Sequence, residues 1–370
     1  MTDSADTFRP DWASPPGDTI ADLLDERGWS QIELARRLGY SPKHMSLLIN
    51  GKASITEDTA LRLERVLGSS ARFWLTREAQ YRAECARLHA AGALDGWVSW
   101  CDDLPVKELM ALGAIPKRKL DPAGKRLVVE DLLRFYRVAS PEDWVEQYAA
   151  MEVQFRRSNA ATSDIGAVSA WLRLGEIEAE RLEGPRYDVA RFRAALQRIR
   201  NLTVHAPEEF ERPLHALCCE AGVVLVLVPA IPRARVSGAA RWLSPHRPLI
   251  QLSLYGKFND RFWLTFFHEA AHLLYHGKRE VFLDELGSKP GGSREEREAD
   301  DWACNFLIPP TYEPSLHLLT SRESVCAFAQ RIGVHPGIVV GRLQHDGVID
   351  HAWMNDVKVR FEFTRDAAAS

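Results

Sequence analysis

The sequence predicts a multidomain chain in which an all-α domain is followed by an α+β domain with a small sheet. Residues 18–90 show short helical patterns separated by tight turns, without strand-like alternation. A β-branched run follows Gly222, and two further apolar stretches, 239–243 and 249–254, are parted by turn-forming residues. The length of 370 residues suits two or three domains, each large enough to bury its own core.

The order of these patterns divides the chain into four expected segments. The first residues are acidic and rich in proline and serine, which is typical of a flexible leader. Between the two domains, helical patterns are broken by loop residues, and Trp97, Trp100, Phe135 and Trp144 have the spacing of core residues. The segments are a flexible leader at 1–17, an all-α domain at 18–90, a helical connector at 91–165 and an α+β domain at 166–370.

Within the α+β domain, apolar periodicity predicts helices at 260–275, 294–307 and 322–332. The tail at 357–363 alternates like a closing strand. The stretch at 249–254, just before the first of these helices, is either an edge strand that binds an extended peptide or an interior strand.

Composition indicates an ordinary soluble protein of the cytoplasm. There are 47 Lys+Arg against 51 Asp+Glu, for a net charge of -4, which excludes a polybasic tail and an acidic disordered chain. The longest apolar run, 223–231, is about half the roughly 20 residues needed to cross a bilayer, so we expect a buried strand there and no contact with a membrane. The amino terminus lacks the features of an export signal, and the cysteines form no C-x-x-C pair, which fits a reducing compartment.

A helix-turn-helix is predicted near the amino terminus. Helical patterns at 31–38 and 42–49 are joined by a short turn that contains glycine. Ser30 and Ser41 are suitable N-caps, and Pro42 occupies the first helical position, where a missing N–H costs nothing.

The charge of this segment favours DNA as its partner. Residues 18–72 contain as many bases as acids, but the bases between 34 and 56 are accompanied by no acid. The alternative is a helical adaptor or dimerisation module. If the second helix enters the major groove, its first residues reach base edges or phosphates and those after it lie near the backbone. The candidate DNA-binding residues are Arg36, Ser41, Lys43, His44, Ser46, Asn50 and Lys52.

The segment His268-Glu269-Ala270-Ala271-His272 has the spacing of a metal site. Histidines four residues apart lie on one face of a helix, so both imidazoles can reach one ion, with Glu269 beside the fourth coordination position. The flanking residues are apolar nearly all round, which predicts a buried helix. Buried imidazoles and a buried carboxylate need partners, so a further ligand is expected from another element.

The helix predicted at 294–307 supplies that ligand. Glu296 and Asp300 share one face with Ala299 and Ala303, whose small side chains allow the two helices to approach. We expect Glu296 to be the third ligand and Asp300 to accept a hydrogen bond from a ligand histidine. Glu298 is the alternative third ligand. A second alternative is that all the acids of this helix form a solvated face and bind no metal.

Two histidines, one glutamate and a fourth position left to water describe a catalytic zinc site. The implied reaction is peptide hydrolysis, with Glu269 as the general base and acid. His276 continues the histidine stripe but lies roughly 12 Å along the helix from His268, so both cannot bind one ion. We expect His276 at the end of the helix near the substrate channel; neither it nor Tyr275 can be assigned as an oxyanion donor.

Residues 18–85 resemble the HigA-like antitoxin branch of the XRE, or lambda-repressor-like, helix-turn-helix family. The resemblance rests on ELARRLGYSP, on LLINGKASITEDTALRLERVLGSS and on ARFWLTREAQYR. It implies a DNA-binding autorepressor, commonly a homodimer, that reads an inverted repeat with half-sites about 34 Å apart.

From about Ala170 the chain resembles the ImmA/IrrE metallopeptidase family. The resemblance rests on FWLTFFHEAAHLLYH, on EREADDWACNFLIP and on IGVHPGIVVGRLQ. It implies a zincin-like fold, zinc on His268, His272 and Glu296, and catalysis by Glu269. Relatives of that family cleave or inactivate helix-turn-helix repressors.

Together these features predict an antitoxin-like transcriptional regulator with a zinc-dependent endopeptidase domain that controls repression by proteolysis. The protein substrate would be a repressor, a toxin or the chain itself. Two alternatives stay open: a repressor that senses a metal or ligand without proteolysis, and a plain antitoxin whose partners are DNA and a toxin.

Overall fold

The structure is a computed structural model that describes residues 12–148, 164–277, 282–285 and 293–363. It divides into two compact units, Met1–Val98 and Ser99–Ser370. Each unit is described by itself.

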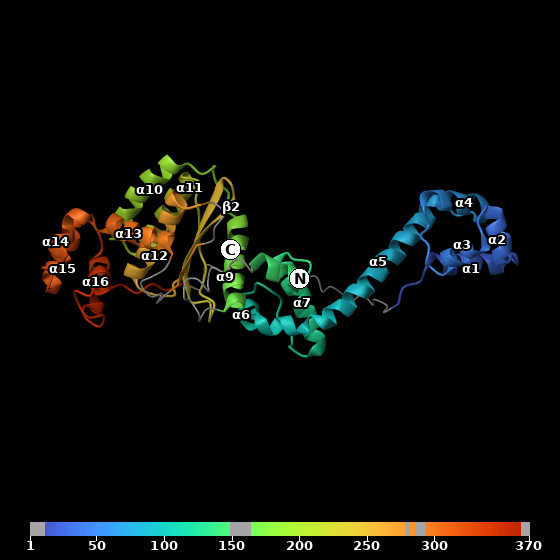
Figure 1. Cartoon of the computed structure of the whole chain (residues 1–370), viewed down its shortest axis with the longest axis horizontal. Coiled ribbons are helices and arrows are strands. Elements are labelled where there is room, and N and C mark those ends of the chain that lie inside the picture. The colour runs from blue at the N-terminus through green and yellow to red at the C-terminus, as the bar shows by residue number, and fades with distance from the viewer. Residues whose placement is uncertain (1–11, 149–163, 278–281, 286–292, 364–370) are drawn as a thin grey trace. The chain divides into compact units, whose positions relative to one another are not determined.

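The first unit is a bundle of helices built around one apolar core (Figure 1). Ser30 and Ser41 cap the second and third helices through hydrogen bonds from the amides of Glu33 and His44, as the sequence predicts. Ala35 is buried where these two helices pack. The helices are α1 (Pro16–Arg27), α2 (Gln31–Leu38), α3 (Pro42–Ile49), α4 (Glu57–Leu67) and α5 (Ala71–Gly96).

Two boundaries of this unit differ from the sequence prediction. Helix α1 begins at Pro16, inside the segment assigned to the leader, and Pro16 is buried. Arg77 of α5 donates hydrogen bonds to the carbonyl and hydroxyl of Ser14, which ties the chain before α1 to the bundle. Helix α5 continues past position 90, where the helical domain was expected to end. The rest of the expected leader, 1–11, lies outside the described residues.

The second unit opens with helices that pack around a cluster of aromatic rings. Trp100, Phe135 and Trp144 are buried, as expected, whereas Trp97 is half-buried. The phenol of Tyr136 shares a hydrogen bond of 3.1 Å with Ser169 on helix α9 (Ile165–Glu180). The elements are η1 (Val98–Asp103), α6 (Val106–Ala111), α7 (Pro122–Tyr136) and a helical segment at 141–148.

A four-stranded sheet forms the centre of the second unit, with helices on both faces (Figure 1). The strand order is β1-β3-β2-β4; β1 is parallel to β3, and β2 is antiparallel to both β3 and β4. Helix α9 covers one face, while α12 packs against the other. The bounds are α9 (Ile165–Glu180), α10 (Val189–Leu202), α11 (Pro207–Glu220), β1 (Val224–Leu227), β2 (Val236–Ser244), β3 (Arg247–Leu252), α12 (Asn259–Tyr275) and β4 (Phe282–Glu285).

The expected peptide-binding edge at 249–254 is wrong. Strand β3 lies between β1 and β2 and pairs with both, so its backbone groups are used inside the sheet. Among the described strands, β1 and β4 lie at the ends of the sheet. The interior alternative for this stretch is therefore confirmed.

Helices complete the chain beyond the sheet. They are α13 (Arg294–Leu307), η2 (Pro310–Tyr312), α14 (Glu313–Leu316), α15 (Arg322–Ile332), α16 (Pro336–His345) and η3 (Asn355–Val357). The helices predicted at 260–275, 294–307 and 322–332 agree with α12, α13 and α15 within one residue. No described helix is both long enough and apolar enough to cross a membrane.

The closing strand expected at 357–363 is absent from the described residues. Only an isolated bridge joins Arg360 to Phe258, and the amide of Phe361 donates to the carbonyl of Lys257. The ring of Phe361 packs against Phe210 and Phe262 in the core. The alternating pattern thus reflects one buried anchor beside the start of α12, since Val359 and Phe363 are exposed.

Close packing of α1 on α3 gives a test of the first unit. A Cβ at Gly17 would overlap the backbone of Ile49, whereas a Cβ at Gly92 on α5 would meet nothing within 4 Å. We expect Gly17→Ala to lower the free energy of unfolding of this unit by about 1 to 3 kcal/mol, because the helices must separate. Gly92→Ala is the matched control and should raise it by up to about 1 kcal/mol. Hydrogen exchange of the core amides of α1 to α4 in the full chain measures both.

Candidate metal centre and nucleic-acid interface

The helix-turn-helix presents the start of α3 to solvent. Lys43 and Ser46 are exposed, and His44 is half-buried because its ring packs edge-on against Tyr40, with ring centroids 4.7 Å apart. Lys52, just after the helix, is also exposed. These side chains have the exposure that contact with a nucleic acid requires.

Two of the candidate residues already have local partners. The Ser41 hydroxyl accepts a hydrogen bond from the His44 amide, so it is engaged as the N-cap of α3. The Asn50 amide donates to the carbonyl of Ser46 at 2.7 Å and closes the end of the same helix. Both side chains therefore stabilise the ends of α3, and a contact with DNA would be an additional role.

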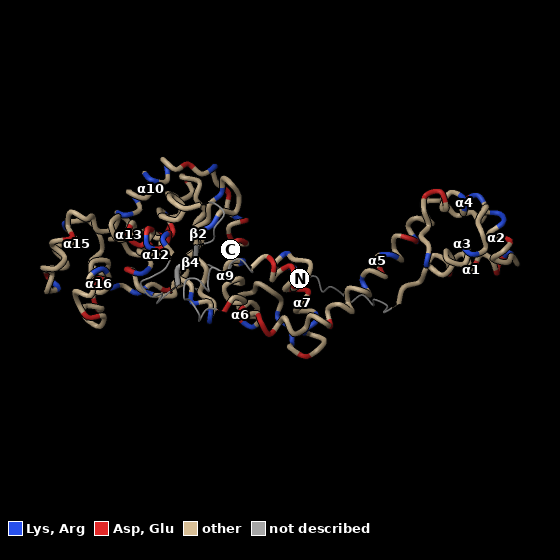
Figure 2. Tube along the Cα trace, in the orientation of Figure 1, with Lys and Arg blue, Asp and Glu red and all other residues tan. Residues whose placement is uncertain are grey.

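An acid lies directly before the stretch 34–56, which contains bases and no acid. Glu33, one turn earlier on α2, pairs with Arg36 at 3.2 Å and with Arg37 at 2.8 Å. The Arg37 guanidinium also stacks over Trp29, 4.1 Å from the ring centroid. The basic residues of α2 (Figure 2) are thus partly neutralised by a residue just outside the stretch that contains no acid.

His268, His272 and Glu296 come together between α12 and α13. Their ligand atoms all lie within 4.8 Å of one another, and the two Nε2 atoms are 3.0 Å apart. Glu296 oxygens lie 3.2 Å from His268 Nε2 and 3.5 Å from His272 Nε2. Ligands about 2.0 to 2.2 Å from a tetrahedral zinc ion are about 3.3 Å from one another, so the two nitrogens and the Glu296 carboxylate have suitable separations for such an ion.

Small residues allow α13 to approach α12 at this point. Ala299 and Ala303 are fully buried on the inner face of α13 and flank Asp300, as the sequence predicts. One turn further on, Phe306 packs against Phe267 of α12, with ring centroids 5.1 Å apart. This contact and the two alanines fix the position along α12 at which Glu296 lies beside the histidines.

The two acids next to Glu296 have different neighbours. Asp300 Oδ1 lies 2.8 Å from His268 Nδ1, the nitrogen that faces away from Glu296. Glu298 is bound by Arg294 at 2.6 Å and lies 3.4 Å from His276 Nε2. Glu298 does not join the group that could hold a metal, so the alternative ligand assignment is not supported.

The ionisation of the cluster suits a metal ion. Burial lowers the pKa of His272 to about 4, although Glu296 acts in the opposite direction. Burial also opposes ionisation of Glu296, but hydrogen bonds with His268 and His272 outweigh it and lower the pKa of this carboxyl to about 2. Near neutral pH the imidazole of His272 is therefore uncharged and Glu296 is a carboxylate, which are the forms that coordinate metals.

Glu269 is fully buried where α12 meets β2. A Cβ at Gly238 would lie 2.6 Å from Glu269 Oε1 and 2.5 Å from Thr265 Cγ2. Position 238 must therefore be glycine if the carboxylate is to keep this place. Sequence analysis missed Gly238, because a single glycine in a strand pattern carries no sign of the residue across from it.

Two family models match the chain. One, described as helix-turn-helix, matches residues 20–74. The other, a peptidase family described as IrrE N-terminal-like domain, matches residues 231–344, which contain the sheet strands β2 to β4 and the helices α12 and α13. The chain joins a helix-turn-helix domain to an IrrE-like peptidase domain.

Two curated proteins are similar to the amino-terminal part of this chain. The Uncharacterized HTH-type transcriptional regulator YddM of Escherichia coli (strain K12) is 43% identical over 60 residues, which are 16% of this chain and 64% of that protein. Virulence-associated protein I of Dichelobacter nodosus is 35% identical over 72 residues, 19% of this chain and 67% of that protein. The chain thus spans about two thirds of the length of each relative.

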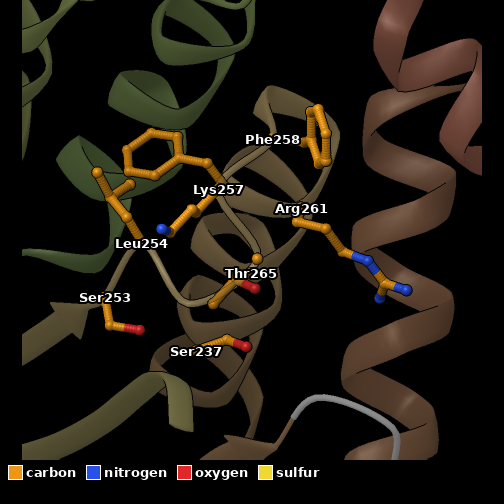
Figure 3. Close-up of a pocket in the computed structure, with 9 residues that line it drawn as sticks. Ser237, Ser253, Leu254, Lys257, Phe258, Arg261 and Thr265 are labelled. Carbon is orange, nitrogen blue, oxygen red and sulfur yellow. The ribbon is translucent and has the colours of Figure 1, made fainter. Parts of the chain in front are cut away.

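A small hollow lies near the start of α12 in the peptidase domain. It is formed where β2 and the end of β3 meet the first turns of α12 (Figure 3). Ser237, Thr265, Leu254 and Lys257 line it, and Figure 3 shows that Arg261 extends away from them. Thr265 lines the hollow one helical turn before Glu269, whereas Glu269 itself is not one of the lining residues.

The neighbouring acids of α13 provide a matched pair for testing the metal centre. Asp300→Asn removes the charged acceptor beside His268 Nδ1, and we expect zinc affinity to fall about 10- to 100-fold. Asp301→Asn changes the next residue, which is exposed, and should leave the affinity unchanged. Competition with a chromophoric chelator measures both dissociation constants. Equal affinities for the two variants would contradict this role of Asp300.

Proposed function

We propose that this chain is a DNA-binding regulator whose carboxy-terminal domain is a zinc-dependent endopeptidase that controls repression by proteolysis. The observation that carries the proposal is the convergence of two Nε2 atoms and one carboxylate, at tetrahedral ligand spacing, beside a buried glutamate. The substrate is a protein, either a repressor, a toxin or the chain itself.

In this proposal His268, His272 and Glu296 hold the ion and leave one position for water or substrate. When bound, zinc supplies Lewis acidity, which polarises a carbonyl oxygen and makes water nucleophilic near neutral pH. Glu269 takes the proton of the attacking water and returns it to the leaving amine. Its burial against Gly238 holds the carboxylate in one place during both transfers.

The sheet suggests where the substrate backbone would lie. Strand β4 is at one end of the sheet, and its Asp284 is the register partner of Gly238, the residue in contact with Glu269. A peptide added along β4 would lie two strand spacings, roughly 10 Å, from Gly238, and main-chain hydrogen bonds would hold it in extended form. The hollow at Ser237 and Thr265 would then receive a neighbouring substrate group.

The amino-terminal unit would bind an operator as a homodimer. Helix α3 would enter the major groove with Lys43, His44 and Ser46 toward the DNA, while Arg36, Asn50 and Lys52 would lie nearer the phosphates. A homodimer of such units would read an inverted repeat with half-sites about 34 Å apart.

A second candidate function is metal sensing without proteolysis. The observation that favours it is the burial of the centre: Glu269 is fully buried, and His268 and His272 are at most 3% exposed. Histidines buried in this way could report metal occupancy to the rest of the domain, while Glu296 keeps 26% of its side chain exposed. The two functions differ in their dependence on Glu269.

Replacing Glu269 by glutamine tests the peptidase proposal. We expect Glu269→Gln to retain zinc, since Glu269 is not a ligand, and to slow cleavage about 100- to 10,000-fold, because the proton transfers are lost. Glu178→Gln, on the surface of α9, is the control and should cleave at the wild-type rate. Elemental analysis measures the metal, and mass mapping measures fragments of the chain and of proteins encoded next to its gene.

The outcome separates the two candidate functions. Complete stability of the chain and of these proteins in the presence of zinc, for wild type as for Glu269→Gln, would exclude the peptidase. Operator binding that depends on zinc and survives Glu269→Gln would instead establish the sensor.

Substitution of Lys43 tests the DNA interface. We expect Lys43→Gln to weaken binding to an operator duplex selected in vitro, and to reduce the slope of log K against log salt by about 0.9 if Lys43 neutralises one phosphate. Arg72→Gln removes an exposed charge at the start of α5 and should leave both quantities unchanged. Fluorescence anisotropy across a salt series gives the two slopes. The same slope for Lys43→Gln as for wild type would remove Lys43 from the interface.

A further inference from the structure

His276 stands at the end of the helix that carries the metal centre. It is the C-cap residue of α12, where the chain leaves the helix with φ −109° and ψ 169°. Its side chain is only 6% exposed, because it turns back toward the centre. His276 Nδ1 lies 2.8 Å from His272 Nδ1, and the two ring centroids are 4.9 Å apart.

The position of His272 dictates which of its nitrogens carries the proton. Its Nε2 faces His268 Nε2 and Glu296, so Nε2 is the atom that would bind a metal ion. An uncharged imidazole that gives its Nε2 lone pair to a metal has its proton on Nδ1. The side chain of His272 is fully buried, so this N–H needs an acceptor within the protein.

We propose that His276 is the positioning residue for His272. His276 accepts the Nδ1–H of His272 on its own Nδ1, which places the remaining proton of His276 on Nε2. That Nε2–H points to Glu298 Oε2 at 3.4 Å, and Glu298 is held in turn by Arg294 at 2.6 Å. The row His272, His276, Glu298 therefore links the end of α12 to the first turns of α13.

This arrangement gives the two ligand histidines different supports. His268 is oriented by a carboxylate, Asp300, at 2.8 Å, whereas His272 is oriented by an imidazole at the same distance. The three histidines of the stripe thus have two kinds of role: His268 and His272 face the ion, and His276 fixes the ring orientation and tautomer of His272. Its two ring nitrogens face His272 and Glu298, so the His276 ring lies between the histidine stripe and α13.

The inference rests on the proposed metal centre, but its test does not depend on proteolysis. Zinc dissociation constants are measured by chelator competition for wild type, His276→Phe and His276→Asn. Phenylalanine keeps a ring without an acceptor, and asparagine places an amide oxygen near the position of Nδ1. We expect His276→Phe to bind zinc about 10- to 100-fold more weakly than wild type, and His276→Asn to recover most of the lost affinity.

Tyr275→Phe is the matched control at the same end of the helix. Tyr275 is 48% exposed and its hydroxyl accepts a hydrogen bond from Arg193, so this variant changes a neighbouring contact without touching His272. Its zinc affinity should equal that of wild type. Circular dichroism of each metal-free variant shows whether the domain remains folded.

The tautomers of His272 and His276 give a second measurement, which would not change if His276 had only a structural role. In the zinc-loaded wild type, nitrogen-15 spectra should show the His272 proton on Nδ1 and the His276 proton on Nε2. Wild-type zinc affinity in folded His276→Phe, or equal loss in the Phe and Asn variants, would overturn the role of His276. Failure of the wild type to bind zinc would overturn the metal centre as well, whereas zinc binding without any cleavage would overturn only the proteolytic function.

Discussion

The peptidase domain depends on the burial of polar side chains in an otherwise apolar helix. Helix α12 lies between the sheet and α13, and its two imidazoles and its carboxylate are removed from water. An unpaired polar group in such a place costs about 1 to 3 kcal/mol. Helix α13 supplies Glu296 and Asp300 to the histidines, and its alanines let it come close enough to do so. The packing of α13 on α12 therefore stabilises the domain and also brings the residues of the candidate metal centre together.

The far face of the sheet is held by a second buried polar network. Arg241 of β2 pairs with Glu176 of α9 at 2.7 Å, and Gln251 of β3 donates to the carbonyl of Trp171 at 2.6 Å. From the same helix, Arg173 donates to the carbonyl of Phe135 at 2.8 Å. These contacts attach the helices around the aromatic cluster to the sheet. From Ser99 onward, the described part of the region predicted as a connector therefore belongs to the compact unit that contains the candidate metal centre, whereas 91–98 belong to the first unit.

Local sequence patterns served well wherever the structure is decided by neighbours along the chain. The capping serines and the turn at Gly39 located α2 and α3, and the spacing of His268 and His272 placed both on one side of α12. The same reasoning failed where the structure depends on side chains outside the local pattern. The alternating tail was predicted to be a strand, whereas it is held by Phe361, which packs against rings of α11 and α12. The acid-free stretch begins directly after Glu33, so it gave no sign that Glu33 pairs with two of its arginines.

By itself the sequence determined the helix-turn-helix layout, the helix with its two histidines, and Glu296 and Asp300 as the acids to expect beside them, because periods of three and four residues fix which side chains share a helix face. Tertiary structure alone decided that β3 is interior and that Gly238 makes room for Glu269. It also decided that His276 turns back to His272 rather than toward solvent. Strand order and contacts across a sheet join residues far apart in the chain, and no local period records them.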